Sequence, residues 1–377
     1  MKVIVAPDSF KGSVSAMGAA KAIEKGIKQY LPEAETVLIP VADGGEGTMD
    51  SLVAATGGKK VELEVTGPLG DPVRAAYGQL GDGRTCVIEM ADASGLYLIP
   101  PERRDPMKAT TFGTGQLIKA ALDAGCREFI LAVGGSATND GGSGMLQALG
   151  MKLLTKDGHE VGFGGGELDQ IATIDDREFD GRITDSTFLL ACDVQNPLIG
   201  PTGASHIFGP QKGATPEMVE ILDKKLSHWA DLVEAQTGIA LHNKAGAGAA
   251  GGIGGAFQAF FSAEMRRGID IVIEYTGLEE ALAGADVVIT GEGQIDYQTA
   301  SGKTPMGVAQ AAQKHGIPTV AFAGSIGKGI EELYQYGIQS VHSIVNGPMS
   351  LADAMNKAEQ LLQQKAEQVI RTMYLHQ

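Results

Sequence analysis

The sequence predicts an α/β protein with a discontinuous, doubly wound, mostly parallel α/β/α domain and a second, mixed α+β domain. The chain has 377 residues, which is more than a domain with a single hydrophobic core usually contains, so two domains are favoured. Near both ends, short apolar strands alternate with polar loops and helices, as in parallel sheets. The middle contains short strands joined by glycine turns without intervening helices, which is typical of antiparallel sheets.

The first parallel elements lie at the N-terminus. Residues 3–6 predict a buried strand, and Ser15 predicts the N-cap of the helix that follows. Residues 37–42 predict the second strand, and residues 48–56 predict the second helix. Two successive strand-loop-helix units place both loops at the same edge of a parallel sheet. We therefore expect the two loops to face the same crevice.

The middle of the chain changes in character twice. Residues 61–65, 73–77 and 85–90 predict antiparallel strands, whereas residues 114–122 and 128–133 predict a helix and a strand of the parallel kind. The domain assignment follows from these changes. The parallel, Rossmann-like domain comprises residues 1–60, 106–150 and 285–377, and the inserted domain comprises residues 61–105 and 151–284.

The remaining elements are predicted from the same patterns. In the inserted domain, residues 216–236 and 256–267 predict helices. The last helix of the parallel domain is predicted to begin with Ser350 and Asp353 as a capping box. Further parallel strands are predicted to begin at Val287, Thr319 and Val341. The apolar stripe of the last helix comprises Leu351, Met355, Ala358, Leu362, Ala366, Val369 and Met373.

Charge and composition exclude several kinds of partner. The chain has 30 basic and 46 acidic residues, a formal charge of −16, which argues against nucleic acid and anionic membranes. No apolar run reaches the ~18 residues of a membrane span, and the N-terminus lacks a signal-peptide pattern, so we expect a cytoplasmic protein. Cys86, Cys126 and Cys192 lack metal-type spacing and lie in or beside apolar segments, so we expect small buried side chains.

The densest group of polar residues lies at 287–305. Residues 290–293 turn the chain out of a predicted strand, and the carboxylates of Glu292 and Asp296 precede the ammonium of Lys303. A strand, a polar glycine turn and a helix form the edge where open α/β sheets bind ligands. Acids beside a lysine and hydroxyls favour an ion-bridged polyanion over an apolar ligand.

Two N-terminal loops carry candidates for binding a small anion. Asp8, Ser9 and Lys11 follow the first strand, and Lys11 offers a cation for a carboxylate. Turn stabilisation explains Asp8 equally well. In the second loop Asp43 is a site candidate, whereas helix capping explains Glu46 better.

Two glycine-rich stretches indicate phosphate binding. GGSATNDGG at 134–142 lies between a strand and a helix, which suits an anion nest, and the alternative is an ordinary turn. GAGAAG at 246–251 has the G-x-G-x-x-G spacing without a preceding strand, so it is either a phosphate cradle or a close helix contact. The chain lacks a phosphate-loop signature, because Tyr297 stands where the first glycine of such a loop is required.

Three further polar residues lie in turns of the inserted domain. Asp193 and Asn196 follow the predicted strand at 188–192, where Asp193 is either a ligand-binding acid or a turn residue. Lys212 is either a solvated lysine or a phosphate clamp. The histidines are scattered without partners at ligand spacing, so we assign no catalytic histidine.

Eight ordered motifs resemble those of the type-1 glycerate kinases over the whole chain. They are APDSFKGS (6–13), PVADGGEGT (40–48), FGTGQLI (112–118), GGSATNDGG (134–142), DVQNPL (193–198), GPQKGA (209–214), GAGAAGG (246–252) and GEGQID (291–296). The resemblance implies an ATP-dependent kinase that phosphorylates D-glycerate at the 2-hydroxyl, giving 2-phosphoglycerate and ADP. It also implies an active site in the cleft between the two domains.

Phosphoryl transfer assigns expected roles to these residues. It requires neutralised phosphates, a metal held by acids and an acceptor hydroxyl aimed in line, so we expect ATP and Mg²⁺ as cofactors. We expect Asp193 or Asp296 to be the catalytic base, and Glu292 and Asp140 to bind the metal. The predicted substrate ligands are Asp8, Ser9, Lys11, Asp43 and Asn196. The predicted ATP ligands are Gly134, Gly135, Ser136, Thr138, Asn139, Lys212, Gly246, Gly248, Gly251 and Lys303.

Three alternative functions stay open at this point. A glycerate 3-kinase would give 3-phosphoglycerate, and the residues alone do not distinguish the two hydroxyls. A nicotinamide oxidoreductase would use GAGAAG as its cofactor turn but has no use for Glu292 and Asp296. A non-catalytic solute-binding protein would have a signal peptide. The expected partner is a small molecule, and exposed antiparallel hairpins leave a homodimer open.

Overall fold

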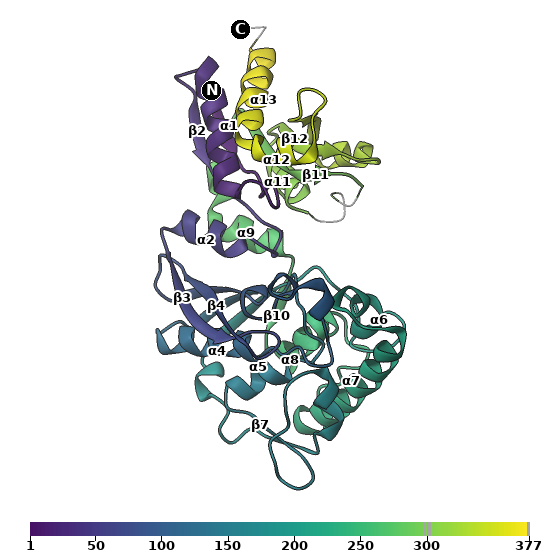
Figure 1. Cartoon of the computed structure of the whole chain (residues 1–377). Coiled ribbons are helices and arrows are strands. Elements are labelled where there is room, and N and C mark those ends of the chain that lie inside the picture. The colour runs from purple at the N-terminus through teal and green to yellow at the C-terminus, as the bar shows by residue number, and fades with distance from the viewer. Residues whose placement is uncertain (298, 300–302, 375–377) are drawn as a thin grey trace. The chain divides into compact units, whose positions relative to one another are not determined.

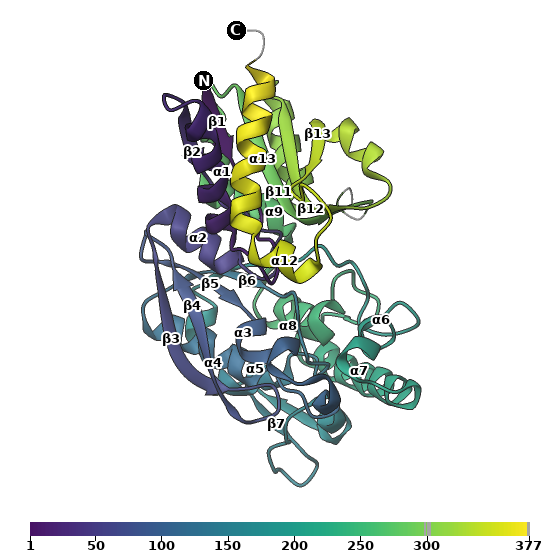
Figure 2. The same ribbon diagram turned by 45° about the horizontal axis from the view of Figure 1, so that its top comes forward.

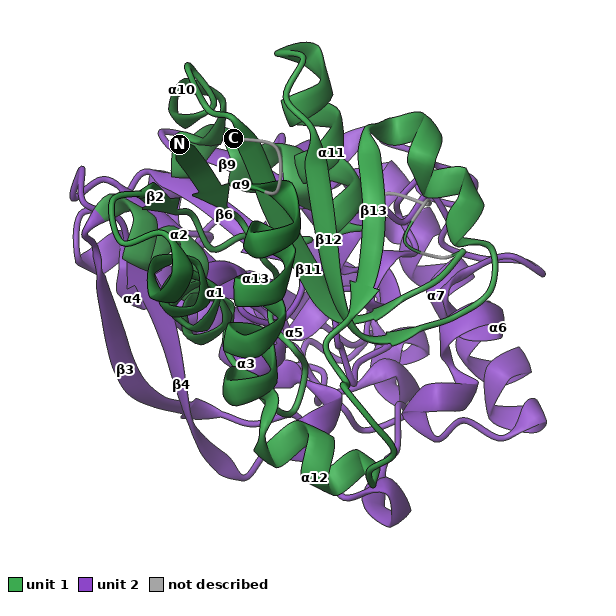
Figure 3. Ribbon diagram, turned by 90° about the horizontal axis from the view of Figure 1, so that it is seen from above, with its two compact units in different colours: residues 1–43, 50–56, 267–377 green, residues 44–49, 57–266 purple. Residues whose placement is uncertain are grey.

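A computed structural model describes residues 1–297, 299 and 303–374 of the chain (Figure 1). The chain divides into two compact units, which Figure 3 shows in green and purple. Unit 1 comprises Met1–Asp43, Asp50–Thr56 and Arg267–Gln377, and unit 2 comprises Gly44–Met49 and Gly57–Arg266. Within the described part of the chain, no helix is both long and apolar enough to cross a membrane.

Unit 1 contains a five-stranded parallel sheet with the order β13-β12-β11-β1-β2. Its strands are β1 (Lys2–Val5), β2 (Glu35–Leu38), β11 (Val287–Ile295), β12 (Thr319–Ile326) and β13 (Ile338–Ser343). The strand order reverses between β1 and β11, because the chain adds β2 on one side of β1 and the later strands on the other. Such a switch point is where open parallel sheets bind ligands beyond the carboxyl ends of their strands.

Helices cover both faces of this sheet. They are α1 (Ala16–Tyr30), α2 (Thr48–Thr56), α9 (Gly268–Thr276), α10 (Leu278–Ala281), α11 (Thr304–Lys314), η8 (Ile330–Tyr336), α12 (Leu351–Asn356) and α13 (Ala358–Met373). The predicted cap of α1 is confirmed, since Ser15 Oγ accepts a hydrogen bond from Gly18 N at 3.1 Å. Figure 2 shows α13 beside α1, and a Cβ at Gly26 would lie 2.1 Å from Gln363 O. Glycine therefore permits this close helix contact.

The last predicted helix is two helices. Ser350 caps α12 as predicted, and its Oγ accepts from Asp353 N at 3.1 Å. The chain then leaves helical geometry at Lys357 before α13 begins. Leu351 is 76% exposed, so the prediction that it begins the apolar stripe is wrong. The buried stripe starts at Ala358, the first residue of α13.

Unit 2 contains a six-stranded mixed sheet with the order β10-β9-β6-β5-β4-β3. Strands β10, β9, β6 and β5 are parallel, and β4 and β3 continue the sheet in antiparallel fashion. The strands are β3 (Lys59–Thr66), β4 (Pro72–Gln79), β5 (Thr85–Glu89), β6 (Glu128–Ala132), β9 (Thr187–Ala191) and β10 (Glu264–Arg266). A separate antiparallel pair consists of β7 (Lys152–Leu154) and β8 (Thr173–Asp175).

The helices of unit 2 are mostly short. They are α3 (Ala91–Ser94), α4 (Phe112–Asp123), α5 (Ser143–Ala148), α6 (Ala204–Phe208), α7 (Pro216–Thr237) and α8 (Ile253–Phe260). Single 3₁₀ turns are η1 (Leu96–Leu98), η2 (Pro101–Arg103), η3 (Gly165–Gln170), η4 (Gly181–Ile183), η5 (Pro210–Lys212) and η6 (Ala249–Gly252). The three cysteines are buried and free, as predicted.

The predicted domain boundaries differ from the two units at residues 44–49 and 57–60, which lie in unit 2, and in two longer segments. Residues 106–150 lie in unit 2, because β6 pairs in parallel with both β5 and β9 of its sheet. Residues 267–284 lie in unit 1, where Ile269 of α9 packs so closely on α11 that a Cβ at Gly307 would lie 2.3 Å from it. The alternation of strands and helices along the chain indicates a parallel sheet, but it does not show which of two sheets a given strand joins.

Two predicted elements also change. The predicted helix at 256–267 ends as α8 at Phe260, because Ser262 has a left-handed backbone with φ 49°, and β10 follows. The predicted turn at 290–293 belongs to β11, which continues to Ile295 and pairs with β12. Glu292 therefore lies on a strand.

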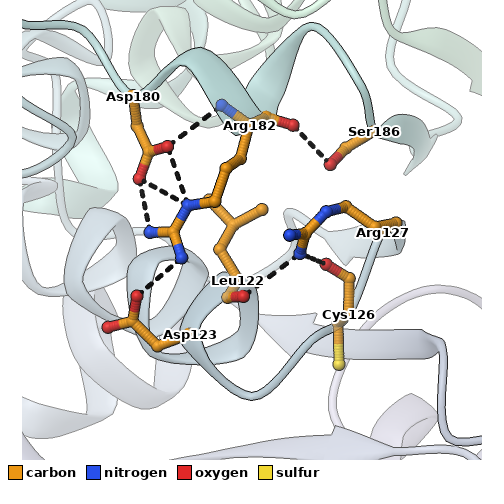
Figure 4. Close-up of polar contacts among 7 residues, drawn as sticks. All are labelled: Leu122, Asp123, Cys126, Arg127, Asp180, Arg182 and Ser186. Carbon is orange, nitrogen blue, oxygen red and sulfur yellow. Dashed lines mark hydrogen bonds and ion pairs between the residues drawn. The ribbon is translucent and has the colours of Figure 1, made fainter.

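A polar network joins the end of α4 to the turn η4 in unit 2. In Figure 4 the Arg182 guanidinium lies between Asp180 and Asp123. Its Nε donates to Asp180 Oδ1 at 2.9 Å, and the other two nitrogens contact Asp180 Oδ2 at 2.6 Å and Asp123 Oδ1 at 2.7 Å. Arg127 donates to the carbonyl of Cys126 at 2.6 Å, beside the same helix end.

Arg182→Met is expected to lower the free energy of unfolding by about 1 to 2 kcal/mol, because it removes a bidentate pair and a second carboxylate contact. Arg177→Met is the matched control. Arg177 also forms a bidentate pair, with Asp175, but its side chain is 85% exposed, so water screens the pair and a smaller loss is expected than for Arg182→Met. Thermal unfolding compares the two variants, and equal losses would contradict the role of the network.

Candidate functional site

The switch point of unit 1 brings two predicted loops side by side. Asp8 N donates to Gly291 O at 2.8 Å, and Thr290 Oγ1 donates to Ala6 O at 2.7 Å. A Cβ at Gly291 would lie 2.3 Å from Phe322 O of the neighbouring strand. Glycine at this position therefore lets β11 pair closely with β12 while its other edge holds the loop after β1.

Asp8 is a buried carboxylate at this switch point. Its Oδ1 accepts from Ser9 N at 2.6 Å, and its Oδ2 accepts from Thr304 Oγ1 at 2.6 Å. Burial and the nearby charge of Asp43 raise the pKa of Asp8 to about 6, although the two hydrogen bonds and Lys11 oppose the rise. Asp8 therefore interacts electrostatically with two other predicted site residues, Asp43 and Lys11.

Glu292 is the second perturbed acid. Its Oε1 accepts from Thr299 Oγ1 at 2.9 Å, and its Oε2 lies 4.0 Å from Lys303 Nζ. Burial raises the pKa of Glu292 to about 7; Lys303 and Thr299 lower it, and Asp8 and Asp43 raise it further. The structure thus gathers three acids, Lys11 and Lys303 at one edge of the sheet.

Asp296 connects to Glu292 through a shared threonine. Asp296 N donates to Thr299 Oγ1 at 3.2 Å, and the same hydroxyl donates to Glu292. Asp296 Oδ2 accepts from Gln294 Nε2 at 2.8 Å, and the residue is 8% exposed. Thr299, in the loop beyond β11, therefore links Glu292 on the strand to Asp296 just after it.

The donor set of the switch point fits Mg²⁺, which prefers carboxylate oxygens and keeps several water ligands. Within the described residues, no group of three or more His, Cys, Asp or Glu is arranged to hold a metal ion. One or two carboxylates completed by phosphate oxygens and water match this arrangement better than a closed protein cage does. Glu292 offers such an oxygen in Oε2, which lies 4.0 Å from Lys303 Nζ, whereas both oxygens of Asp8 already accept hydrogen bonds.

In unit 2 the loop 134–142 connects β6 to α5. Gly134 and Gly135 are exposed, whereas the residues from Ser136 to Asp140 are buried. A Cβ at Gly134 would lie 3.3 Å from the Cα of Gly45, so two glycine segments meet at this exposed point. Glycine permits this close approach, and phosphate binding at the exposed backbone stays a prediction.

Asp140, a predicted metal ligand, instead bonds the backbone and a side chain of its own unit. Its Oδ2 accepts from Thr111 N at 2.9 Å and Thr111 Oγ1 at 2.8 Å, and its Oδ1 accepts from Gly142 N at 3.1 Å. Burial raises its pKa, and these hydrogen bonds lower it. With no exposed surface and both oxygens bonded, Asp140 fastens the loop to the start of α4. This geometry favours the turn-stabilising alternative.

Three predicted ATP ligands point into unit 2. Thr138, Asn139 and Lys212 are at most 2% exposed. Asn139 Nδ2 donates to Ser205 Oγ at 2.9 Å, and Lys212 Nζ donates to Ser136 Oγ at 2.8 Å and Thr138 O at 2.6 Å. The side chains of Asn139 and Lys212 therefore hold the loop from its buried side.

The glycines of the stretch 246–252 are explained by close packing. Gly248 N donates to Asn196 O at 3.0 Å, and a Cβ at Gly248 would lie 2.1 Å from Pro197 O. Gly251 O accepts from Gly141 N at 2.9 Å, and a Cβ at Gly251 would lie 2.0 Å from Thr138 O. Of the two alternatives for this stretch, a phosphate cradle and a close helix contact, close packing is favoured. The segments that pack against these glycines are loops and not a helix.

The loop after β9 contains the other two predicted residues of unit 2. Asp193 is exposed and lies two residues beyond the end of β9, which stops at Ala191. Asn196 Nδ2 donates to Thr202 O at 2.8 Å within the loop. The structure therefore leaves Asp193 accessible and uses the Asn196 amide to shape the loop.

Sequence reasoning did not pair these acids with the hydroxyl groups that bond them, and it did not single out Glu89. Thr304 binds Asp8, Thr299 binds Glu292 and Thr111 binds Asp140. Glu89, at the carboxyl end of β5, accepts from Met49 N at 2.8 Å. Thr304 carried a signal, because it directly follows Lys303 at the start of a predicted helix, whereas the pairing of Thr111 and Asp140 lies 29 residues apart.

Comparisons with known proteins find similar sequences and a similar structure along almost the whole chain. A sequence profile of the glycerate kinase family matches residues 3–374. The chain is 52% identical over 375 residues to glycerate kinase of Bacillus subtilis (strain 168), covering 100% of this chain and 98% of the relative. It is 49% identical over 358 residues to glycerate 2-kinase of Escherichia coli (strain K12), covering 95% and 94%. A crystal structure from Salmonella typhimurium LT2, assigned as glycerate kinase 2, has a TM-score of 0.90 at 48% identity and covers 99% of this chain and 98% of that chain.

Proposed function

The chain belongs to the glycerate kinase family, and on this premise we propose that it transfers the γ-phosphoryl group of ATP to the 2-hydroxyl of D-glycerate. The products are 2-phosphoglycerate and ADP. The observation that carries the proposal is the match along almost the whole chain to a glycerate 2-kinase. The same match does not favour the 3-kinase alternative.

The acids and lysines at the switch point of unit 1 support a phosphoryl-transfer role. We propose that Lys11 and the amide of Ser9 bind the glycerate carboxylate, while Asp8 and Asp43 orient its hydroxyls. Asp296 is one candidate for the base that accepts the proton of the 2-hydroxyl, because Thr299 fixes its backbone beside Glu292. Asp193 of unit 2 is the other candidate for this base.

Mg²⁺ fits beside Glu292 and would neutralise phosphate charge when bound. Glu292 would hold the ion directly or through water, and Lys303 would contact the polyphosphate. Asp140 is not proposed as a metal ligand, because its oxygens already accept hydrogen bonds from Thr111 and Gly142.

The nucleotide is proposed to use the glycine loops of unit 2. The exposed backbone at Gly134 and Gly135 is the proposed contact for phosphates, and Ser136 anchors it. Gly246, Gly248 and Gly251 are assigned the packing of this region instead of direct contact. Substrate binding by Asn196 stays a prediction. So do a cytoplasmic location and the formation of a homodimer.

The proposal is tested by ADP formation with purified protein, MgATP and D-glycerate. We expect ADP to form only when D-glycerate and Mg²⁺ are both present, and EDTA to stop the reaction. A nicotinamide oxidoreductase would instead change absorbance with NADH. Binding of D-glycerate without any ATP turnover would favour the solute-binding alternative and contradict the kinase assignment. Near wild-type turnover of both Asp193→Asn and Asp296→Asn would remove these acids from the base role.

A further inference from the structure

Lys212 is a buried lysine whose position is fixed by the fold of unit 2. It ends the turn η5 and is 2% exposed. The next residue, Gly213, has φ 94°, and a Cβ there would lie 2.5 Å from Arg104 O. Only glycine reverses the chain here without a clash, so the direction of the Lys212 side chain is set by its neighbours.

The ammonium of Lys212 binds the buried side of the loop 134–142. It donates to two neutral groups, Ser136 Oγ at 2.8 Å and Thr138 O at 2.6 Å. They lie two residues apart in the loop and immediately follow the exposed Gly134 and Gly135. Lys212 thus spans the part of the loop that supports the exposed glycines.

The charge of Lys212 is only partly compensated inside the protein. Asp140 is the charged group that favours its ammonium form, and the oxygens of Asp140 already accept hydrogen bonds from Thr111 and Gly142. Burial outweighs Asp140 and lowers the pKa of Lys212 to about 7. A buried ammonium with neutral acceptors is costly, and an anion on the other side of the loop would reduce that cost.

We propose that Lys212 is a positioning residue for the nucleotide polyphosphate: it fastens the loop through Ser136 and Thr138 and supplies a positive charge from the buried side without touching the ligand. The inference rests on the proposed function, because it requires ATP at Gly134 and Gly135. It gives a chain of formal charge −16 a local attraction for phosphates. The attraction acts through the loop because Coulomb forces are strong inside a protein.

The test compares ligands that differ only in their number of phosphates. Trp229, the single tryptophan, donates from Nε1 to Gly141 O at 3.1 Å, so its fluorescence reports on this loop. Adenosine, AMP, ADP and ATP are titrated into wild-type protein and Lys212→Met. We expect the loss of affinity to increase along this series, from under twofold for adenosine to about 30-fold for ATP.

Lys225→Met is the matched control. Lys225 also lies in unit 2, donates to Gly166 O at 2.8 Å, pairs with Asp169 at 2.5 Å and has a 13% exposed side chain. Removing its ammonium is expected to lower stability but to leave all four affinities within twofold of the wild type. An equal loss of affinity for all four ligands in Lys212→Met, or no loss, would overturn the proposal. If Lys212 had only a structural role, the loss of affinity would not depend on the number of phosphates in the ligand.

Ser136→Ala covers the case in which Lys212→Met does not fold. It keeps the ammonium and removes one of its two loop bonds, so ATP affinity is expected to fall several-fold. Unchanged ATP affinity in this variant would overturn the positioning role. Failure of the proposed function gives a different result, since wild-type protein would then show no ADP formation that depends on D-glycerate.

Discussion

Glu292→Gln is expected to lower kcat by roughly 10²- to 10³-fold, which is among the largest effects on activity of any change at the switch point. The substitution keeps the shape of the side chain and its contact with Thr299, but it removes the negative charge beside Lys303. A neutral amide neither holds Mg²⁺ well nor balances Lys303. Steady-state kinetics with saturating ATP and D-glycerate measure the loss.

The same variant is expected to be more stable than the wild type at pH 8 in EDTA. Burial raises the pKa of Glu292 from its ordinary 4.5 to about 7, so the folded state binds an extra proton between these values. Its contribution to stability is therefore fully present below pH 4.5 and is lost as the pH rises through 7, by at most about 3 kcal/mol. The amide of the variant cannot ionise, so the gain in stability should vanish near pH 4.5.

Asp82→Asn is the control with the opposite sign. Burial of Asp82 alone would raise its pKa, but hydrogen bonds from Thr85 and Arg84 outweigh burial and lower it. This carboxylate therefore stabilises the fold above its unfolded pKa, and the Asn variant should lose stability at pH 8 while keeping turnover. Normal turnover of Glu292→Gln, or lower stability than the wild type at pH 8, would contradict the account of Glu292.

Gly251→Ala is expected to destabilise unit 2 by about 3 to 5 kcal/mol. Gly251 has φ 70°, and a Cβ would lie 2.0 Å from Thr138 O, which is a backbone atom. The carbonyl would have to move, and this carbonyl also accepts from Lys212. A higher KM for ATP should therefore accompany the loss of stability, measured by urea unfolding with Trp229 fluorescence.

Gly238→Ala separates backbone strain from the steric clash. Gly238 has a similar φ of 75° at the end of α7, but nothing lies within 4 Å of the Cβ that Ala would add. Its loss should be limited to about 1 to 2 kcal/mol, the cost of the left-handed backbone. Equal losses in the two variants would mean that the contact between Gly251 and Thr138 does not constrain the loop.

The sequence predicted the switch point well because its evidence is local. Asp8 and Glu292 each follow an apolar run of a parallel strand, and parallel strands end at one edge of the sheet. Charge and hydroxyl content then led to the prediction that these loops bind a polar ligand, which stays a prediction. The environment of Asp8 was not predictable, because Thr304, which donates to its Oδ2, lies 296 residues away in the sequence.

The glycine loops of unit 2 show the limit of motif reading. Gly251 and Gly134 belong to stretches of similar composition, yet one is required by a backbone contact and the other is exposed. The spacing of glycines alone does not distinguish a glycine required by packing from one that exposes the backbone, because both positions lack a Cβ. Lys212 is a second case, because a lysine in a polar turn is usually solvated, and only the packed structure shows its burial.

Phosphorus NMR of the product tests the central claim most directly. Purified protein is incubated with D-glycerate and MgATP, without a coupling enzyme, and the phosphorus spectrum is recorded as ATP is consumed. The account predicts the signal of 2-phosphoglycerate together with ADP. A 3-phosphoglycerate signal would contradict transfer to the 2-hydroxyl, and an unchanged ATP spectrum in the presence of D-glycerate would contradict the kinase assignment itself.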